Sequence, residues 1–132
     1  MLEKYPQQVK LVFKNFPLRS HKFARQAATA ALAAHAQGRF WEFHDALFAS
    51  YSNLNEAKVE EIRARFNLDK SAFDTQRKAS QVTDQIKKDI HWAKKAGVRG
   101  TPAVFINGRL QRSRSLKSFS AAVETELLRL GK

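Results

Sequence analysis

None of the 132 residues of this chain is a cysteine, which limits the chemistry that it can perform. Without a thiol the chain can form no disulfide, hold no metal through thiolates and attack no substrate with a Cys nucleophile. Thiol chemistry by this chain alone is therefore excluded. The missing cysteines say nothing about its compartment, because there is no thiol to be kept reduced or oxidised.

Histidines and carboxylates are the next candidates. The four histidines are His21, His35, His44 and His91. No two of them form a His-Glu-x-x-His pair, and no carboxylate–histidine cluster surrounds them. Glu42, His44 and Asp45 lie close together in "WEFHD", but no nucleophile elbow or phosphate-binding glycine loop accompanies them. We expect no catalytic residue, no metal site and no cofactor.

Basic residues dominate the charge, since 24 Lys and Arg against 12 Asp and Glu leave a net charge of +12. Such a charge attracts polyanions. In "RLQRSRSLK", strand alternation places Arg112 and Arg114 on one face, with Arg109 beside the turn. The sequence has no helix-turn-helix, zinc or RNP-type signature. We expect no specific nucleic-acid partner, and polyanion binding stays a less favoured alternative.

The stretch "GVRGTPAVFINGR", residues 97–109, is the most informative part of the chain. The apolar segment "AVFI" and the segment "LQRS" flank Asn107–Gly108, which is the dipeptide most typical of a two-residue type I′ turn. A β-hairpin is therefore predicted, with Thr101 and Pro102 immediately before its first strand. An X-Pro bond is cis in only about 5% of cases in folded proteins, so cis is not expected from the dipeptide alone.

The remaining elements follow from periodicity. Residues 9–13, "VKLVF", are predicted to form a short buried strand because they are apolar and rich in β-branched and aromatic residues. Helical spacing predicts most of residues 21–96 to be helices, with Ser20, Asn55 and Asp69 as caps, and a last helix opened by Ser118. No apolar run is long enough to span a bilayer, and the N-terminus has no apolar signal segment.

Four stretches, in this order, resemble one known family: "VKLVFKNFPLRSH", "AATAALAAHAQGRFWEFHDALF", "IKKDIHWAKKAGVRGTPAVFINGR" and the closing amphipathic helix. They are similar to the DsbA-like thiol-disulfide oxidoreductases of the thioredoxin fold. In that family a strand, a Cys-x-x-Cys motif and a helix precede the segment matched by "VKLVF". Here "MLEKYP" resembles only the tail of that helix, so the first β-α unit is expected to be missing.

The resemblance implies an α/β fold, thioredoxin-like, in one incomplete domain over residues 1–132. It implies a helical insertion at about 20–96 and a small three-stranded sheet, made of 9–13 and the hairpin. It also implies that the Thr101–Pro102 bond is cis and that Thr101 and Pro102 face an extended peptide or protein substrate. A periplasmic or other extracytoplasmic setting is implied by resemblance alone, since this chain shows no signal peptide.

Three functions remain after the resemblance. The leading hypothesis is a relative of thiol-disulfide oxidoreductases that is inactive in this cysteine-free form, because no residue can form the mixed disulfide. The others are a non-catalytic module that holds extended peptides and a basic polyanion binder.

We also expect a homodimer and no membrane partner. Two strands that should flank a third would stand about 10 Å apart with unpaired backbone groups, and a second copy could supply the missing pairing.

Overall fold

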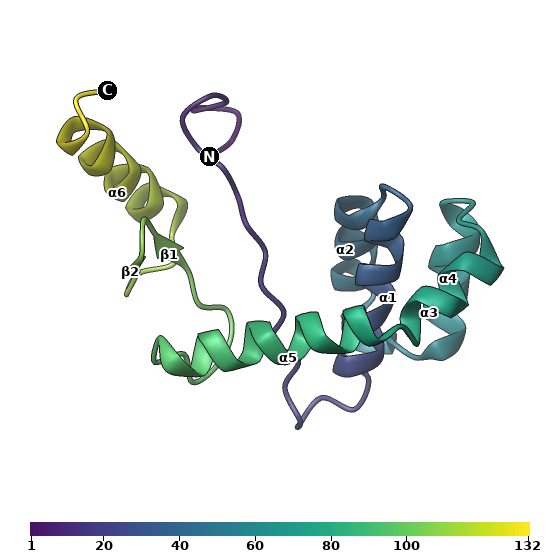
Figure 1. Ribbon diagram of the computed structural model, residues 1–132. Helices are drawn as coiled ribbons and strands as arrows, with labels where there is room; N and C mark the ends of the chain where they lie inside the picture. The colour runs from purple at the N-terminus through teal and green to yellow at the C-terminus, as the bar shows by residue number, and fades with distance from the viewer. The chain divides into compact units, whose positions relative to one another are not determined.

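The computed structural model describes residues 1–132, which form two compact units (Figure 1). Residues 15–97 make up one, called here the helical unit. Residues 1–14 and 98–132 make up the other, called here the hairpin unit. The expected insertion at 20–96 lies within the helical unit. Neither unit has a helix that combines the length and the apolar character needed to cross a membrane.

The helical unit is organised around its first helix. Its elements are α1 (Ala24–Ala36), α2 (Phe40–Ala49), a 3-10 turn η1 (Tyr51–Asn53), α3 (Glu56–Arg65), α4 (Lys70–Arg77) and α5 (Ser80–Lys95). Helix α1 contacts each of α2, α3, α4 and α5 (Figure 1). Four alanines of α1 are buried, namely Ala30, Ala31, Ala33 and Ala34. Their small side chains let neighbouring helices approach closely, and Phe43, Ile62 and Phe73 fill the core beside them.

Side-chain caps begin two of these helices where the sequence predicts them. Asn55 Oδ1 accepts a hydrogen bond of 2.8 Å from the Lys58 N–H at the start of α3, and Asp69 Oδ2 accepts one of 2.8 Å from the Ala72 N–H at the start of α4. The cap expected at Ser20 is wrong. The chain turns through residues 18–24, with the His21 N–H bonded to the Leu18 carbonyl, so the first helical turn of α1 begins only at Ala24.

A buried carboxylate ties the start of the helical unit to its longest helix. Asp89 on α5 is 4% exposed. Its Oδ2 accepts hydrogen bonds from the Asn15 backbone N–H at 2.9 Å and from Asn15 Nδ2 at 2.8 Å, and its Oδ1 accepts one from Gln85 Nε2 at 2.8 Å. The periodicity of the sequence does not predict this contact, because Asn15 and Asp89 are far apart in the sequence.

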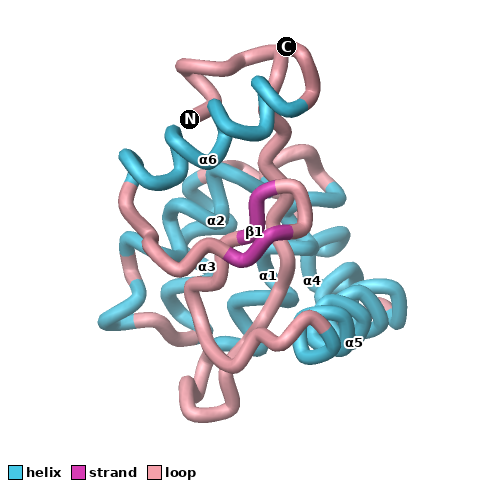
Figure 2. Tube along the Cα trace, turned by 90° about the vertical axis from the view of Figure 1, so that its left-hand side faces the viewer, coloured by secondary structure: helices cyan, strands magenta, loops and turns pink.

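The hairpin unit contains all of the strand structure. Strands β1 (Phe105–Ile106) and β2 (Arg109–Leu110) pair antiparallel, with Phe105 opposite Leu110 and Ile106 opposite Arg109. Figure 2 shows how short the two strands are beside α6 (Leu116–Arg129). Helix α6 begins one turn earlier than expected, because Ser115 rather than Ser118 is its cap and accepts a bond of 3.1 Å from the Ser118 N–H.

The third strand expected at residues 9–13 does not form, so the sheet has two strands rather than three. The segment is irregular, and Leu11 and Val12 are 57% and 58% exposed instead of buried. A strand is stable only when its backbone groups pair with a neighbour. No strand of this chain pairs with residues 9–13, so β-propensity alone does not create one here.

Candidate functional site

The loop before the hairpin is open to solvent. Gly100, Thr101, Pro102 and Ala103 are all exposed, and the Thr101–Pro102 peptide bond is cis. Arg114, which follows β2, reaches back to this loop and donates a hydrogen bond of 3.1 Å from Nη1 to the Pro102 carbonyl oxygen. The two residues that the sequence predicts to face a peptide therefore lie at the surface of the hairpin unit, with an arginine beside them.

The turn of the hairpin is the two-residue type that Asn107–Gly108 predicts. Asn107 and Gly108 have φ angles of 47° and 78°, as a type I′ turn requires at both positions. The Asn107 side chain donates a hydrogen bond of 3.2 Å from Nδ2 to Glu126 Oε2 on α6. This contact anchors the tip of the hairpin to the helix.

Glu126 joins the hairpin to α6 through charge as well. It is 6% exposed. Its Oε2 lies 2.8 Å from Arg129 Nη2, and its Oε1 lies 3.5 Å from Arg109 Nη1. The hydrogen bonds from Arg129, and then that from Asn107, lower the pKa of the Glu126 carboxyl below its ordinary value. Glu126 is thus held as a carboxylate, and its contacts link α6 to the hairpin.

One edge of β1 has no partner. The Gln111 N–H donates a hydrogen bond of 2.8 Å to the Val104 carbonyl, so the backbone groups of Val104 face β2. In an antiparallel pair the direction of these groups alternates along the strand, so those of Ala103 and Phe105 point to the opposite side. We call these two residues the outer edge of β1. The sequence predicted the hairpin but did not single out this edge.

The two faces of the hairpin differ in exposure. Val104 and Ile106 are half-buried on the side of α6, and Ile106 lines a shallow depression there together with Ala122 and Thr125 of that helix. On the other face Phe105 and its cross-strand partner Leu110 are 38% and 52% exposed. The outer edge of β1 is therefore bordered by an apolar face that is partly exposed to solvent.

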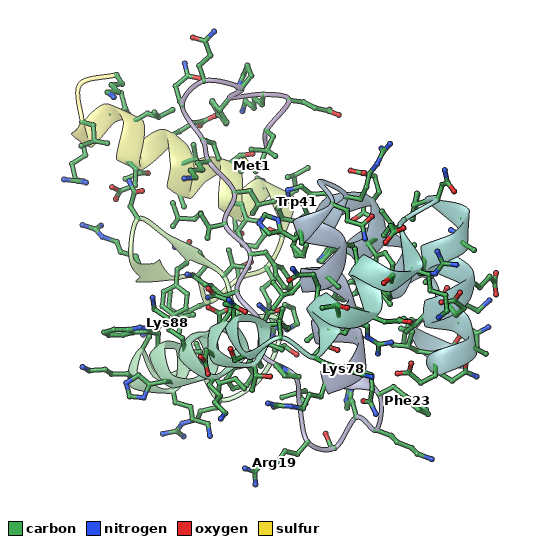
Figure 3. All side chains as sticks on the ribbon, turned by 45° about the vertical axis from the view of Figure 1, so that its right-hand side comes forward. Met1, Arg19, Phe23, Trp41, Lys78 and Lys88 are labelled. Atoms are coloured by element: carbon green, nitrogen blue, oxygen red, sulfur yellow. The ribbon has the colours of Figure 1, made fainter.

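The titratable residues weighed in "WEFHD" all lie on α2. His44 Nδ1 lies 3.0 Å from Asp45 Oδ1, and the His44 ring packs against the aromatic rings of Phe40, Trp41 and Phe48 on α2 (Trp41 is labelled in Figure 3). No group of three or more His, Asp or Glu side chains gathers closely enough to hold a metal ion. His44 is part of an aromatic cluster rather than of a nucleophile–base pair.

Arg112 and Arg114 do not share a strand face, because β2 ends at Leu110. Arg109 pairs with Glu126, whereas Arg112 is exposed at a bend and Arg114 turns to the Pro102 carbonyl. The alternation assumed for residues 109–114 thus fails after Leu110. Its failure brings Arg114 to the loop that contains Thr101 and Pro102.

Known proteins match this chain in three ways. A family model described as Thioredoxin matches residues 1–125. A solved structure described as a thioredoxin-like oxidoreductase, from Silicibacter pomeroyi DSS-3, is similar with a TM-score of 0.81 and 27% identity, over 97% of this chain and 73% of that one.

Among curated proteins, the Na(+)/H(+) antiporter NhaA 3 of Salinispora tropica is 36% identical over 117 residues, which is 87% of this chain and 18% of the antiporter. The antiporter NhaA of Nitrosospira multiformis is 32% identical over 110 residues, which is 80% of this chain and 17% of that protein. The chain spans less than a fifth of these relatives.

Proposed function

Because this chain belongs to the thioredoxin family, we propose that it is a cysteine-free thioredoxin-like module that holds an extended peptide segment and performs no thiol–disulfide exchange by itself. Within the family we place it with the DsbA-like proteins, on the resemblance of its sequence. The proposed binding site is the loop at Thr101 and Pro102 together with the outer edge of β1.

The observation that carries the proposal is the unpaired outer edge beside an exposed loop. Thr101 and Ala103 contribute no backbone group to the hydrogen bonds of the chain, and the outward groups of Phe105 follow from the alternation. An extended peptide can add to such an edge as a further strand, with main-chain hydrogen bonds supplying affinity. The exposed Phe105 and Leu110 can then pack against alternate side chains of the peptide.

The lack of thiol exchange rests on chemistry. Exchange proceeds when a thiolate attacks a disulfide sulfur and forms a mixed disulfide, and this chain has no thiol that could attack or be attacked. The oxidoreductase named for the similar solved structure therefore supports a shared scaffold and not an activity of this chain alone. The antiport named for the curated relatives is not proposed, since the match covers under a fifth of each.

Two measurements test the proposal. Insulin reduction by dithiothreitol should proceed at the same rate with and without the purified chain, and any turnover above that blank would contradict redox inactivity. Binding of a fluorescent peptide with alternating apolar residues should be weakened by Ala103→Pro, which removes the outward N–H while leaving the bond between Val104 and Gln111 intact.

The matched control is Ala103→Ser, which keeps the N–H and should bind the peptide as the parent chain does. Thermal melts of both variants would show that the hairpin unit still folds. Equal binding by Ala103→Pro and Ala103→Ser would rule out the outer edge of β1 as the binding site.

A further inference from the structure

We infer that the segment bound at the outer edge of β1 is acidic, an inference that rests on the proposed function and names its substrate class. The charges of the hairpin unit support it. Residues 1–14 and 98–132 carry ten of the 24 Lys and Arg residues but only three of the twelve Asp and Glu residues. The unit therefore has an excess of seven positive charges, which requires negative charge from a partner or from solution.

Two of the three carboxylates of this unit are already neutralised within it. Glu124 Oε1 accepts from Lys4 Nζ at 2.7 Å and from the Tyr5 hydroxyl at 2.6 Å. Glu126 is bound by Arg129 and Arg109. The remaining carboxylate, Glu3, is exposed in the N-terminal turn and forms no ion pair with the cations near the loop.

Four cations near the loop have no carboxylate partner. They are Arg99, Arg112, Arg114 and Lys117, called here the loop cations, and all four are exposed. Arg114 touches the Pro102 carbonyl, Arg99 precedes Thr101 by two residues, and Arg112 follows Gln111, which is bonded to Val104. The cations therefore flank the segment 101–104 on both sides in the chain, and Arg114 contacts this segment directly.

The start of α6 adds to this positive field. A helix N-terminus carries a partial positive charge, which acidic residues in the first turn commonly offset. Helix α6 has no acidic residue in its first turn and has Lys117 there instead. The helix end and the loop cations thus favour the same sign of charge in a bound segment.

Charge also decides between an acidic peptide and a second copy of this chain as the occupant of the edge. Two hairpin units would bring like charges together, and like charges placed opposite each other on paired strands are destabilising. An acidic extended segment satisfies both the edge and the cations. Its alternate apolar side chains would cover Phe105 and Leu110, while its carboxylates would face the loop cations.

Three nine-residue peptides would test the inference, with the same alternating valines and with Glu, Gln or Lys at the positions between them. By fluorescence anisotropy at about 50 mM salt, the Glu peptide should bind roughly tenfold more tightly than the Gln peptide, because several exposed ion pairs each contribute a little. The Lys peptide should bind most weakly. Raising the salt to about 500 mM should remove most of the difference.

A pair of charge-matched variants would locate the effect. Arg112→Glu with Lys117→Glu should reverse the preference, whereas Lys87→Glu with Lys88→Glu on α5 changes the net charge equally and should keep it (Lys88 is labelled in Figure 3). Equal effects of the two pairs would contradict a preference set by the loop cations. The peptide series on the unaltered chain gives an answer even if a variant does not fold.

The outcomes separate this inference from the proposed function. Equal binding of the three peptides would overturn the acidic preference and leave peptide binding standing, whereas no binding of any peptide would overturn both. A dimer at about 50 mM salt that Ala103→Pro dissociates would identify a second copy as the occupant and would also overturn the inference.

Discussion

At the scale of single residues, the positions that matter most are those whose backbone rather than side chain is available. Thr101 and Ala103 have small side chains, and the feature that distinguishes them is that their N–H and C=O groups are unused. Backbone N–H and C=O groups are strong hydrogen-bonding groups, as polar side chains are. A site of this kind recognises extended shape first, and it gains selectivity only from nearby side chains such as Arg114.

Glu126 offers a test of how the hairpin is held on α6. Its pKa is lowered in the folded chain, chiefly by Arg129, so its contribution to stability is fully present above the ordinary glutamate pKa of about 4.3. That contribution is lost as the pH falls through the lowered value. Glu126→Gln should therefore lower the melting temperature at pH near 7, and the difference from the parent should shrink toward about pH 3.

The control for this experiment is Glu3→Gln, since Glu3 is exposed in the same unit and makes no ion pair. It should leave the melting temperature unchanged across the same range, as followed by circular dichroism. A Glu126→Gln difference that stays constant from neutral to acid pH would mean that the packing of the side chain matters and its charge does not.

At the scale of elements, the helices are determined locally and the strands are not. Helix α3 illustrates the local case, because the Asn55 cap and the buried Val59 and Ile62 are all within its own sequence. Strand formation needs a neighbour as well as propensity. Residues 105–110 supply their own neighbour through a two-residue turn, whereas residues 9–13 have none, and only the former become strands.

The Asn55 cap should be measurable in the stability of the whole helical unit. Asn55→Ala removes the acceptor of the Lys58 N–H and should lower the free energy of unfolding by about 1 kcal/mol, as measured by urea denaturation. The matched variant Asn53→Ala, in the preceding 3-10 turn, removes an exposed side chain and should change it by less than about 0.5 kcal/mol. Equal losses would show that the cap does not begin α3.

At the scale of the whole molecule, the apolar surface is divided unequally. The packed core of buried residues that surrounds Phe43 and Phe73 lies entirely in the helical unit. Val123 is the one buried apolar residue of the hairpin unit, whereas nine of the thirteen large apolar residues that are exposed belong to this unit. Exposed apolar residues mark an interaction site where they lie side by side, as Phe105 and Leu110 do across the hairpin. The hairpin unit is therefore where we expect a partner.

The homodimer expected from the sequence stays a prediction. Because the hairpin unit is positively charged, we expect the dimer to depend on the salt concentration. Two copies can pair their outer β1 edges about a two-fold axis, but repulsion between positive units opposes this until salt screens it. Light scattering coupled to size exclusion should show a monomer at about 50 mM salt and increasing dimer toward about 500 mM, the reverse of the trend for an acidic peptide.

Ala103→Pro should suppress the salt-induced dimer, while Ala103→Ser should not, because only the former removes the outward N–H of the edge. A monomer at both salt concentrations would contradict the expected self-association. A dimer that both variants retain would place the contact elsewhere on the molecule.

The sequence by itself determined the features that depend on neighbours a few residues away. The helices, the caps at Asn55 and Asp69 and the turn at Asn107–Gly108 all follow from short-range sterics and hydrogen bonds. The absence of a thiol is evident from the composition alone. The family likeness likewise came from motifs in order along the chain, and the match over residues 1–125 bears it out.

Only the tertiary structure decided what depends on residues distant in sequence. Whether "VKLVF" becomes a strand depends on a partner that its own residues cannot supply, and it does not. The contact of Arg114 with Pro102 and the bonds of Asn15 to Asp89 arise because folding brings separate segments together. The open edge of β1 is of the same kind, since an edge exists only once it is known which strands have paired.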